Sequence, residues 1–350
     1  MSLDPAPKIL VIRRDNIGDL VCTTPLIAAL RRRFPAGWLG ALVNSYNAPV
    51  LAGNPDLDEV LVYTKAKHRG HGESLPGILW RRLQMMRRLR DMAIDDVIIA
   101  TTSPQPRVLR QAQWLRPKRI IGFGAVAGLD VALPLDDAGR HEVEDVFRAA
   151  ALYGIDGAPP ACHVVSDGTS TADVMTIGVH ISARKPSQRW PAERFAEAMR
   201  TIAAQAPVRF MLLWSPGAED NPLHPGDDAK ARDLMARVSG GTQGAGAGDT
   251  AITVEARPTL SLPELIAALS ECSAVICADG GAMHLAAGLG RPIVCLFGDS
   301  GAARWRPWGV PYRLLQAPSR DVRDIQAGEV VAAFNALRAD IPAPSAAGRP

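Results

Sequence analysis

The feature that most constrains this chain is a repeated alternation of short β-branched runs with amphipathic stretches of helical length. In the first half, the pattern predicts strands at residues 9–12, 40–43, 60–62, 96–100 and 119–122, and helices at 20–33, 78–92, 108–114 and 141–153. Such alternation is typical of βα units that build a parallel sheet covered by helices on both faces. Residues 154–171 are rich in Gly, Pro, Ser and Asp and predict a break between domains.

A second series of the same kind follows the break. Strands are expected at 176–181, 208–213, 251–254, 274–277 and 292–297, and helices at 192–205, 228–238, 262–270 and 282–289. The glycine-rich run 239–249 has no strand before it, so we interpret it as a surface loop. The expected fold class is α/β, with two doubly wound domains in tandem. The expected boundaries are 1–157, a linker at 158–175, a second domain at 176–327, and a helix with a disordered tail at 328–350.

Composition supports a folded, two-domain chain. The chain is 47% hydrophobic and 21% charged, which excludes a disordered chain. Its 350 residues are more than one ordinary hydrophobic core accommodates. A net charge of +3 is too small to indicate nucleic-acid binding. The five cysteines form no C-x-x-C pair, and neither a leader peptide nor an apolar run of spanning length is visible. We therefore expect a soluble, cytoplasmic protein.

The segment RRDNIGD at 13–19 stands between the first expected strand and a helix. In an open α/β sheet, ligands bind beyond the carboxyl ends of the strands, so this segment is expected at the mouth of a crevice. Gly18 would let the backbone approach a ligand closely. Asp19 falls in the first helical turn, where the amides and the macrodipole favour an ionised carboxylate. Helix capping by Asp15, Asn16 or Asp19 is the alternative interpretation.

The segment DGGAMH at 279–284 follows another expected strand and begins a helix. Gly280 and Gly281 leave amide donors accessible at a helix N-terminus, which is an arrangement that binds phosphate groups. The segment therefore suits a diphosphate. His284 points either toward such a ligand or into the domain, and a lone histidine of this kind is often structural.

Two further polar segments follow strands of the second half. The segment RKPSQRWP at 184–191 places cationic side chains before a helix that starts at Trp-Pro, which resembles a clamp for an anion. A solvated basic loop is the alternative. Glu219, in WSPGAE at 214–219, could accept hydrogen bonds from ribose hydroxyl groups.

Three ordered segments together resemble the heptosyltransferase family, the ADP-heptose:lipopolysaccharide transferases of glycosyltransferase family nine. They are KILVIRRDNIGDLVCTTPLIAALRRRFP, SARKPSQRWPAERFAEAM and ICADGGAMHLAAGLGRPIVCLFGDS, and RWRPWG at 304–309 follows them. The resemblance runs from about Lys8 to about Trp308. It implies a GT-B fold, in which two Rossmann-like domains face each other across a cleft. It also implies an inverting, metal-independent transfer, with the acceptor on the N-terminal domain and the sugar nucleotide on the C-terminal one.

The same resemblance implies roles for individual residues. Asp19 is the general base that takes a proton from the acceptor hydroxyl, and Asn16 and Gly18 lie beside the acceptor. Asp279 holds hydroxyl groups of the donor sugar, and Glu219 contacts the nucleotide. The remaining donor-binding residues surround or neutralise the diphosphate: Gly280, Gly281, Ala282, His284, Arg184, Lys185, Gln188 and Arg189.

Two positions depart from the usual pattern of the family. Gly280 stands where Ser or Thr usually follows the aspartate, so one hydroxyl group that would contact phosphate is missing. Gln188 stands where a lysine is frequent, and Arg189, Arg184 or Lys185 would have to supply the positive charge. The departures bear on the identity of the donor more than on the class of reaction, because a nucleotide diphosphate still needs neutralising.

Positive charge is concentrated in one part of the N-terminal half. Residues 65–119 hold 13 Lys or Arg against four Asp or Glu. In the expected helix 78–92, apolar side chains recur at helical spacing while arginines occupy the other faces. Such a helix could meet anionic lipid headgroups or a phosphorylated glycolipid core. An ordinary surface helix whose arginine stems cover the domain is the alternative.

The leading hypothesis is a glycosyltransferase that moves a heptose, or a related sugar, from an ADP-sugar to a hydroxyl group of a saccharide acceptor, with the lipopolysaccharide inner core as the expected acceptor. Such an enzyme needs no cofactor besides this co-substrate and binds no nucleic acid. Peripheral contact with the inner membrane is left as an open alternative. The alternatives are transfer to a protein or a secondary metabolite, and a non-catalytic module that binds nucleotide sugars. A nicotinamide dehydrogenase is disfavoured because the first βα turn has only Gly18 and lacks G-x-G-x-x-G.

Overall fold

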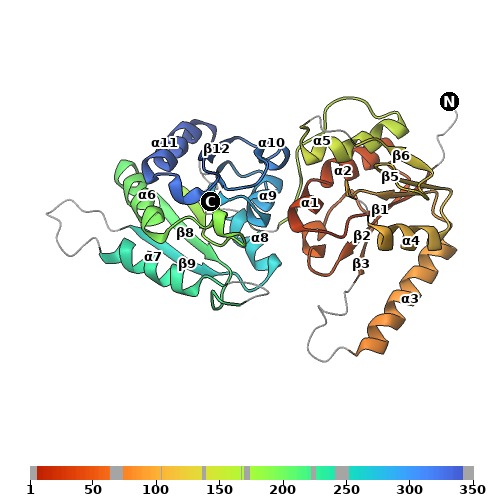
Figure 1. Cartoon of the computed structure of the whole chain (residues 1–350), viewed down its shortest axis with the longest axis horizontal. Coiled ribbons are helices and arrows are strands. Elements are labelled where there is room, and N and C mark those ends of the chain that lie inside the picture. Colours follow the sequence, from red (N-terminus) through yellow and green to blue (C-terminus); the bar gives the residue numbers. More distant parts are fainter. Residues whose placement is uncertain are drawn as a thin grey trace, which may run out of the picture. The chain divides into compact units, whose positions relative to one another are not determined.

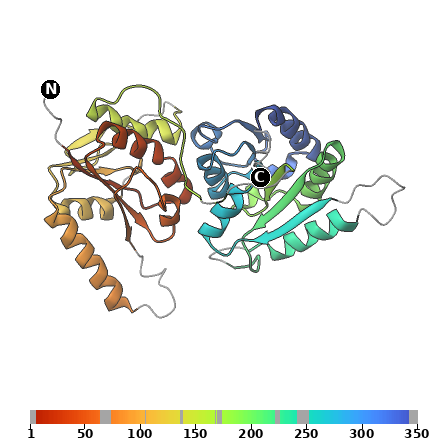
Figure 2. The same ribbon diagram turned by 180° about the vertical axis from the view of Figure 1, so that it is seen from behind.

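The chain forms two compact units, Met1–Val165 and Ser166–Pro350. The computed structural model describes residues 6–63, 74–103, 105–135, 139–166, 168, 174–221, 226–240 and 252–341. Within these residues each unit is built on one six-stranded parallel sheet with helices on both faces (Figures 1 and 2). No helix in this part of the chain is both long enough and apolar enough to cross a membrane.

In the first unit the strands lie in the order β3-β2-β1-β4-β5-β6. They are β1 (Lys8–Ile12), β2 (Trp38–Asn44), β3 (Glu59–Tyr63), β4 (Asp96–Ile99), β5 (Arg119–Phe123) and β6 (Val131–Leu133). The α-helices are α1 (Ile17–Val21), α2 (Thr24–Arg33), α3 (Leu75–Asp91), α4 (Pro106–Leu115) and α5 (Glu142–Phe147), and the 3-10 helices are η1 (Ala48–Leu51) and η3 (Arg148–Tyr153).

The central strand of this unit is buried on both faces. Leu10 and Ile12 of β1 pack on the side of α3 and α4, in a cluster that includes Leu89 of α3. Ile9 and Val11 are equally buried on the opposite side. Alternate side chains of a strand point to opposite faces, so a continuous apolar run is the pattern required of a strand covered twice.

The second unit has the strand order β12-β11-β10-β7-β8-β9. Its strands are β7 (Thr176–His180), β8 (Arg209–Trp214), β9 (Thr253–Pro258), β10 (Ala274–Ala278), β11 (Ile293–Phe297) and β12 (Tyr312–Gln316). The α-helices are α6 (Ala192–Gln205), α7 (Asp228–Gly240), α8 (Leu262–Ser270), α9 (Gly281–Gly288), α10 (Ala302–Trp305) and α11 (Ala327–Leu337), and the 3-10 helices are η4 (Pro186–Gln188), η5 (Val322–Asp324) and η6 (Arg338–Asp340).

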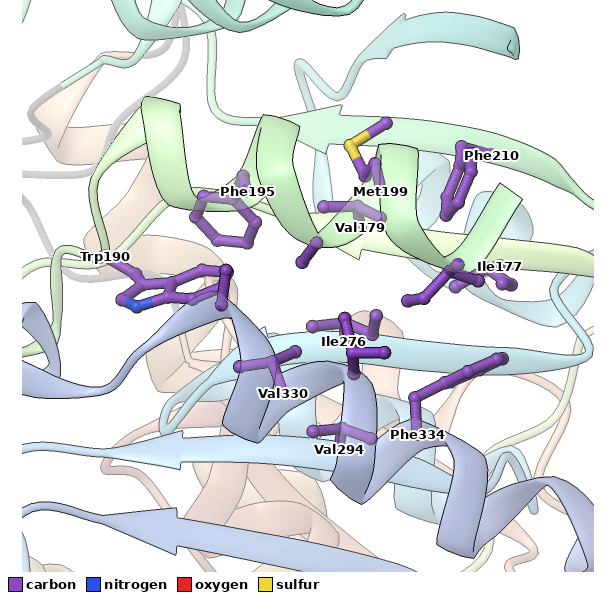
Figure 3. Packing of buried hydrophobic residues seen from close by; sticks show 14 of the residues in the cluster. Ile177, Val179, Trp190, Phe195, Met199, Phe210, Ile276, Val294, Val330 and Phe334 are labelled. Carbon is purple, nitrogen blue, oxygen red and sulfur yellow. The ribbon is translucent and has the colours of Figure 1, made fainter. Parts of the chain in front are cut away.

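Figure 3 shows the core between this sheet and the helices α6 and α11. Phe195 of α6 and Phe334 of α11 are buried against the central strands. Trp190, which precedes α6, is 1% exposed. Its ring meets Phe195 edge to face at 4.6 Å between centroids, and its indole nitrogen donates to the carbonyl of Ile325 at 3.0 Å. The start of α6 is therefore fixed by packing and by a satisfied buried donor.

The strand orders confirm the expected fold class. Numbered from the start of each unit, both sheets run 3-2-1-4-5-6, which is the order of a doubly wound Rossmann sheet. In each unit the first and fourth strands are neighbours, and in a sheet of this strand order the connections that leave these two strands lead to opposite faces. The crevice at this switch point is where such sheets bind ligands.

Several local predictions need correction. The helix expected at 20–33 is two helices, because α1 already starts at Ile17 and α2 starts afresh with Pro25 in its first turn. A proline lacks the amide donor that a continuous helix would need at this position. The helix expected at 141–153 changes to 3-10 geometry at Arg148. The strand expected at 251–254 is β9, which starts at Thr253 and runs to Pro258.

Two strands and one short helix escaped prediction. β6 has only three residues, and every residue of β12 is only partly buried, so neither has a clear apolar run. The short helix is α10. The glycine-rich run 239–249 and the tail after α11 extend into 241–251 and 342–350, which lie outside the described residues.

Candidate functional site

The loop after β1 lies at the switch point of the first unit. Arg13 still pairs with β2, since its amide donates to the carbonyl of Leu42 at 3.1 Å. The chain then turns at Asn16, an exposed residue at the N-cap of α1. Gly18 and Asp19 are both in α1 and are buried at the level of the whole residue. The strand order therefore puts this loop where ligands of a doubly wound sheet bind.

The carboxylate of Asp19 is held on both of its oxygens. Oδ1 accepts from Nη2 of Arg13 at 2.6 Å. Oδ2 accepts from the amide of Asn16 at 3.2 Å and from its side-chain nitrogen at 2.9 Å. About 12% of the side chain is exposed. Asp19 thus caps the helix, as the alternative interpretation required, and also presents an oriented carboxylate at the switch point.

Arg13 connects this carboxylate to two others. The guanidinium is 1% exposed and donates to Asp15 at 2.8 Å and to Glu142 of α5 at 2.8 Å, as well as to Asp19 and the carbonyl of Ala100. Burial by itself would lower the pKa of Arg13, but the three carboxylates outweigh it and raise that pKa above its usual value. One cation is therefore shared by a cluster of three carboxylates.

The pKa of Asp15 reflects this imbalance of charge. Its pKa is raised, first because the side chain is buried and then because the charge of Asp19 lies nearby, while Arg13 opposes the shift. The carboxyl group of Asp15 therefore holds a proton more readily than an exposed aspartate does.

In the second unit, one hydrogen bond joins the loops that follow β7 and β10. Gln188 is 6% exposed, and its side-chain nitrogen donates to Oδ2 of Asp279 at 2.9 Å and to Oγ of Ser300 at 3.0 Å. Because both N–H groups are used in this way, Gln188 orients Asp279. β7 and β10 are the strands at the switch point, so Asp279 lies where the sheet order predicts a ligand.

The residues after Asp279 form the N-terminus of α9. Gly280 has φ of 153° and is the N-cap of this helix, and a side chain there would be strained. Gly280 is exposed and Gly281 partly so, whereas Ala282 is buried. His284 is 5% exposed and meets the ring of Trp305 edge to face at 6.1 Å. Accessible amides at the start of a helix form an anion site.

The cations of the middle segment differ in what they contact. Arg189 pairs with Glu219, and its Nε donates to the carbonyl of Ala183 at 3.0 Å. Lys185 pairs with Asp299 at 3.0 Å. Arg184 is exposed and has no ion-pair partner among the described residues. Of the expected cations, Arg184 is therefore the one whose charge is least compensated.

Lys230 of α7 lies close to the pair formed by Arg189 and Glu219. Its ammonium donates to the carbonyl of Ile181 at 2.9 Å. Burial lowers the pKa of Lys230 to about 8, and the charge of Arg189 adds to that effect, while Asp227 raises the pKa. Lys230, Arg189 and Glu219 therefore form one charged cluster at this end of the sheet, with Asp227 beside it.

Three residues of these networks were not expected from the sequence. Arg13 was visible only as part of the RRDNIGD segment, although a cation that directly follows a buried strand is a signal of a charge partner. Glu142 is 129 positions from Arg13 and fully buried. Ser300 is 112 positions from Gln188. No local pattern links such distant residues.

The cysteines are placed away from solvent. Cys22, Cys162, Cys272, Cys277 and Cys295 are all buried, and none of the five forms a disulfide bond. Burial raises the pKa of Cys272 to about 12, so its thiol is unreactive at neutral pH. Within the described residues, no three His, Cys, Asp or Glu side chains are arranged to hold a metal ion.

Sequence comparisons point to one family. The model of glycosyltransferase family 9 (heptosyltransferase) matches residues 133–327. Lipopolysaccharide heptosyltransferase 3 of Escherichia coli is 23% identical over 91% of this chain and 96% of its own length. Lipopolysaccharide heptosyltransferase 2 of Salmonella typhimurium is 21% identical over 84% of this chain and 83% of its own length.

Solved structures share the fold. A glycosyl transferase family 9 protein from Veillonella parvula aligns with a TM-score of 0.73 at 20% identity, over 96% of this chain and 98% of the other. The heptosyltransferase WaaC of Escherichia coli, solved with ADP, aligns with a TM-score of 0.74 at 17% identity, over 94% and 99%. These likenesses confirm the GT-B class that the sequence predicted.

Proposed function

This chain belongs to glycosyltransferase family 9, the heptosyltransferase family, and on that premise we propose that it transfers a heptose from ADP-heptose to a hydroxyl group of a saccharide of the lipopolysaccharide inner core. The observation that carries the proposal is the carboxylate of Asp19, which Arg13 and Asn16 orient at the switch point of the first unit.

In the proposed reaction Asp19 is the general base. As the acceptor oxygen attacks the anomeric carbon of the heptose, its proton passes to the carboxylate of Asp19. The bond between that carbon and the diphosphate breaks, and its electron pair leaves with ADP, so the configuration at the anomeric carbon is inverted. Arg13 and Asn16 keep the carboxylate in one orientation. General-base assistance of this kind is typically worth about 10²–10⁴-fold.

The second unit would bind the donor. Asp279, oriented by Gln188, accepts hydrogen bonds from hydroxyl groups of the sugar. The amides of Gly280, Gly281 and Ala282 surround the diphosphate with His284. Negative charge develops on the diphosphate as ADP leaves, and Arg184 is the cation with no described carboxylate partner to compete for it.

The relatives support this donor. One related structure contains ADP, and another, of the same Escherichia coli enzyme, contains ADP-2-deoxy-2-fluoro heptose. Several relatives are named for transfer to lipopolysaccharide. Glycosylation of a protein or of a secondary metabolite is the competing acceptor class, and analysis of the product separates it from the first.

The decisive test is release of ADP by the purified protein with ADP-heptose and heptose-deficient core saccharide. Asp19→Asn keeps the size of the side chain and removes the base, so kcat should fall by about 10²–10⁴-fold. Asp15→Asn is the matched control, since it removes the other carboxylate that Arg13 holds in this loop. It should lose less than tenfold.

Three results would contradict the proposal. The wild type could bind ADP-heptose without ever releasing ADP in the presence of acceptor, which would indicate a binding module. Asp15→Asn could lose as much activity as Asp19→Asn, which would remove the special role of Asp19. Finally, mass spectrometry of the core from a host with and without the intact gene could show no missing heptose.

A further inference from the structure

A buried glutamate outside the loop of Asp19 contacts the arginine that holds Asp19. Glu142 is the first residue of α5, and its side chain is 0% exposed. A carboxylate removed from water is costly unless a group of opposite charge compensates it. That group is Arg13, which stands 129 positions earlier and donates to Glu142 at 2.8 Å. This ion pair joins α5 to the loop after β1.

Nη2 of Arg13 serves two carboxylates at once. It donates to Oδ1 of Asp19 at 2.6 Å and to Oε1 of Glu142 at 2.8 Å. A terminal guanidinium nitrogen carries two N–H groups, so each carboxylate can take one of them. The other nitrogens of the guanidinium donate to the carboxylate of Asp15 and to the carbonyl of Ala100. The orientation of Nη2 toward Asp19 therefore depends in part on Glu142.

The first turn of α5 is fixed independently of Arg13. The ring of His141 accepts from the amide of Val143 at 3.1 Å, and the side chain of Glu144 accepts from the amide of His141 at 2.7 Å. Together these contacts form a capping box. His141 and Val143 are 1% and 0% exposed. Glu142 therefore extends from a rigid turn and can hold the guanidinium in place.

Two carboxylates on one nitrogen also influence each other. The oxygens of Asp19 and Glu142 that accept from Nη2 are no more than about 6 Å apart, which is within the range where one charge changes the proton affinity of another. A neighbouring negative charge makes a carboxylate bind its proton more tightly, and a neighbouring cation has the opposite effect. Glu142 therefore counteracts the effect of Arg13 on Asp19.

The charged groups near this cluster come from the loop after β1 and from the region of α5. In the loop, Asp15 accepts from Nε of Arg13 at 2.8 Å. At the start of α5, Arg140 and Asp145 form an ion pair with each other at 3.0 Å, so their charges compensate. Glu142 is therefore the charge that α5 supplies to Arg13.

From these contacts we propose that Glu142 is a positioning residue for the transfer reaction. It fixes the guanidinium of Arg13 against Asp19 and takes up part of its positive charge, so that Asp19 stays oriented and still accepts the proton of the acceptor hydroxyl group. The link from Glu142 to Asp19 stands on the geometry alone, and its meaning for catalysis rests on the proposed function.

Two substitutions separate the position of this side chain from its charge. Glu142→Gln removes the charge and keeps an oxygen that can accept from Nη2. Its amide nitrogen can donate to the hydroxyl group of Thr102, which lies 3.3 Å from both carboxylate oxygens. Glu142→Asp keeps the charge and shortens the side chain. The matched control is Glu144→Gln, which removes a negative charge from the same turn at a side chain that caps the helix.

The first readout is release of ADP, measured from about pH 4 to about pH 8 with ADP-heptose and heptose-deficient core saccharide. In Glu142→Gln the acid limb of kcat should move down by about one pH unit, because fewer carboxylates then share the charge of Arg13. The plateau of kcat should fall about threefold, since a weaker base assists less, and both KM values should change less than about twofold. Glu142→Asp should keep the acid limb of the wild type and lose about ten- to a hundredfold in kcat through misplacement of Arg13. Glu144→Gln should match the wild type in both respects.

Protonation can also be followed without turnover. Carbon NMR of protein labelled at its aspartate carboxyl carbons reports the pH midpoint at which Asp19 binds its proton, and Asp19→Asn identifies the signal. This midpoint should fall by about one pH unit in Glu142→Gln and stay in place in Glu144→Gln.

Several results would overturn the inference. One is an acid limb and a midpoint that do not move in Glu142→Gln, and another is an equal shift in Glu144→Gln, which would reduce the effect to net charge. A Glu142→Gln chain that fails to fold would show a role in stability alone and would also count against it. A shifted midpoint without any release of ADP by the wild type would refute the proposed function and leave the coupling of Glu142 to Asp19 standing.

Discussion

Replacing Arg13 by methionine removes the cation that three buried or partly buried carboxylates share. Arg13→Met keeps a long unbranched stem in the same space. The side chains of Asp15, Asp19 and Glu142 are 18%, 12% and 0% exposed, so water can replace the guanidinium only in part. Breaking one buried ion pair by removal of a partner costs about 3–5 kcal/mol. We expect the first unit to lose about this much of its free energy of unfolding at pH 8.

The loss should depend on pH, and its sign follows from the carboxylates. The pKa of Asp15 is raised even with Arg13 present, so without Arg13 the folded chain binds a proton at Asp15 more tightly than the unfolded chain does. Stability is then lost as pH rises from the unfolded-state pKa through the higher folded-state pKa, by about 1.4 kcal/mol for each pH unit that separates the two values. Arg13→Met should therefore be less destabilised at pH 5 than at pH 8, by at least about 1 kcal/mol.

The cysteines allow each unit to be measured separately. All five are buried and none forms a disulfide bond, so pulsed thiol labelling with peptide mass spectrometry reports when each becomes accessible in urea. Cys22 and Cys162 report the first unit, and Cys272, Cys277 and Cys295 report the second. With a urea dependence of about 2 kcal/mol per molar, the midpoint at Cys22 should fall by about 2 M in Arg13→Met at pH 8.

The control is Arg87→Met, which removes an exposed arginine of α3 and should change stability by no more than about 0.5 kcal/mol. The reasoning fails if the midpoint at Cys22 is the same in Arg13→Met and Arg87→Met. It also fails if the loss in Arg13→Met is equal at pH 5 and pH 8. A shift of the same size at Cys277 would show that the effect is not local to the carboxylate cluster.

The other predictions concern the second unit. In Gly280→Ala the added Cβ would meet no neighbouring atom within 4 Å. The free-energy cost therefore comes from the strained φ of 153° and is about 1–3 kcal/mol. Calorimetry should show ADP binding weakened at least fivefold. Gln188→Leu leaves Asp279 without its 2.9 Å donor and should raise KM for the donor about tenfold while kcat changes little. Lys230 has a pKa of about 8 in the folded chain and therefore binds a proton less well there than in the unfolded chain. The free energy of unfolding should rise by up to about 3 kcal/mol from pH 8 to about 10. Lys230→Met should abolish that rise, as measured by the labelling of Cys277.

Much of the fold could be predicted because its signals are local. The range expected for α6 is the observed one, with Pro191 immediately before it, and α8 begins after Ser261, whose hydroxyl accepts from the amide of Glu264. Where local signals conflict, prediction failed. The apolar and basic pattern of 20–33 continues across Pro25, and only the amide that proline lacks reveals the break between α1 and α2.

The candidate site was predictable in position and not in detail. A polar loop after a buried strand is enough to place Asp19 and Asp279 at the carboxyl ends of the sheets. The partners of these residues are set by the packing of distant elements. Glu142 reaches Arg13 from α5, and Gln188 turns its amide onto Asp279, which the sequence had suggested only as a contact of the donor.

Both departures from the family pattern adjoin Asp279, Gln188 through a hydrogen bond and Gly280 as the next residue in the sequence. Gln188 donates to Asp279, and Gly280 follows Asp279 with a backbone conformation that a serine or threonine would resist. Substituting the usual residue at 280 alone would therefore strain the loop instead of adding a hydroxyl contact. A glutamine brings no charge, so the contact of Gln188 with Asp279 is a hydrogen bond and not an ion pair. The departures thus lie in two different loops that one hydrogen bond joins, the one from Gln188 to Asp279.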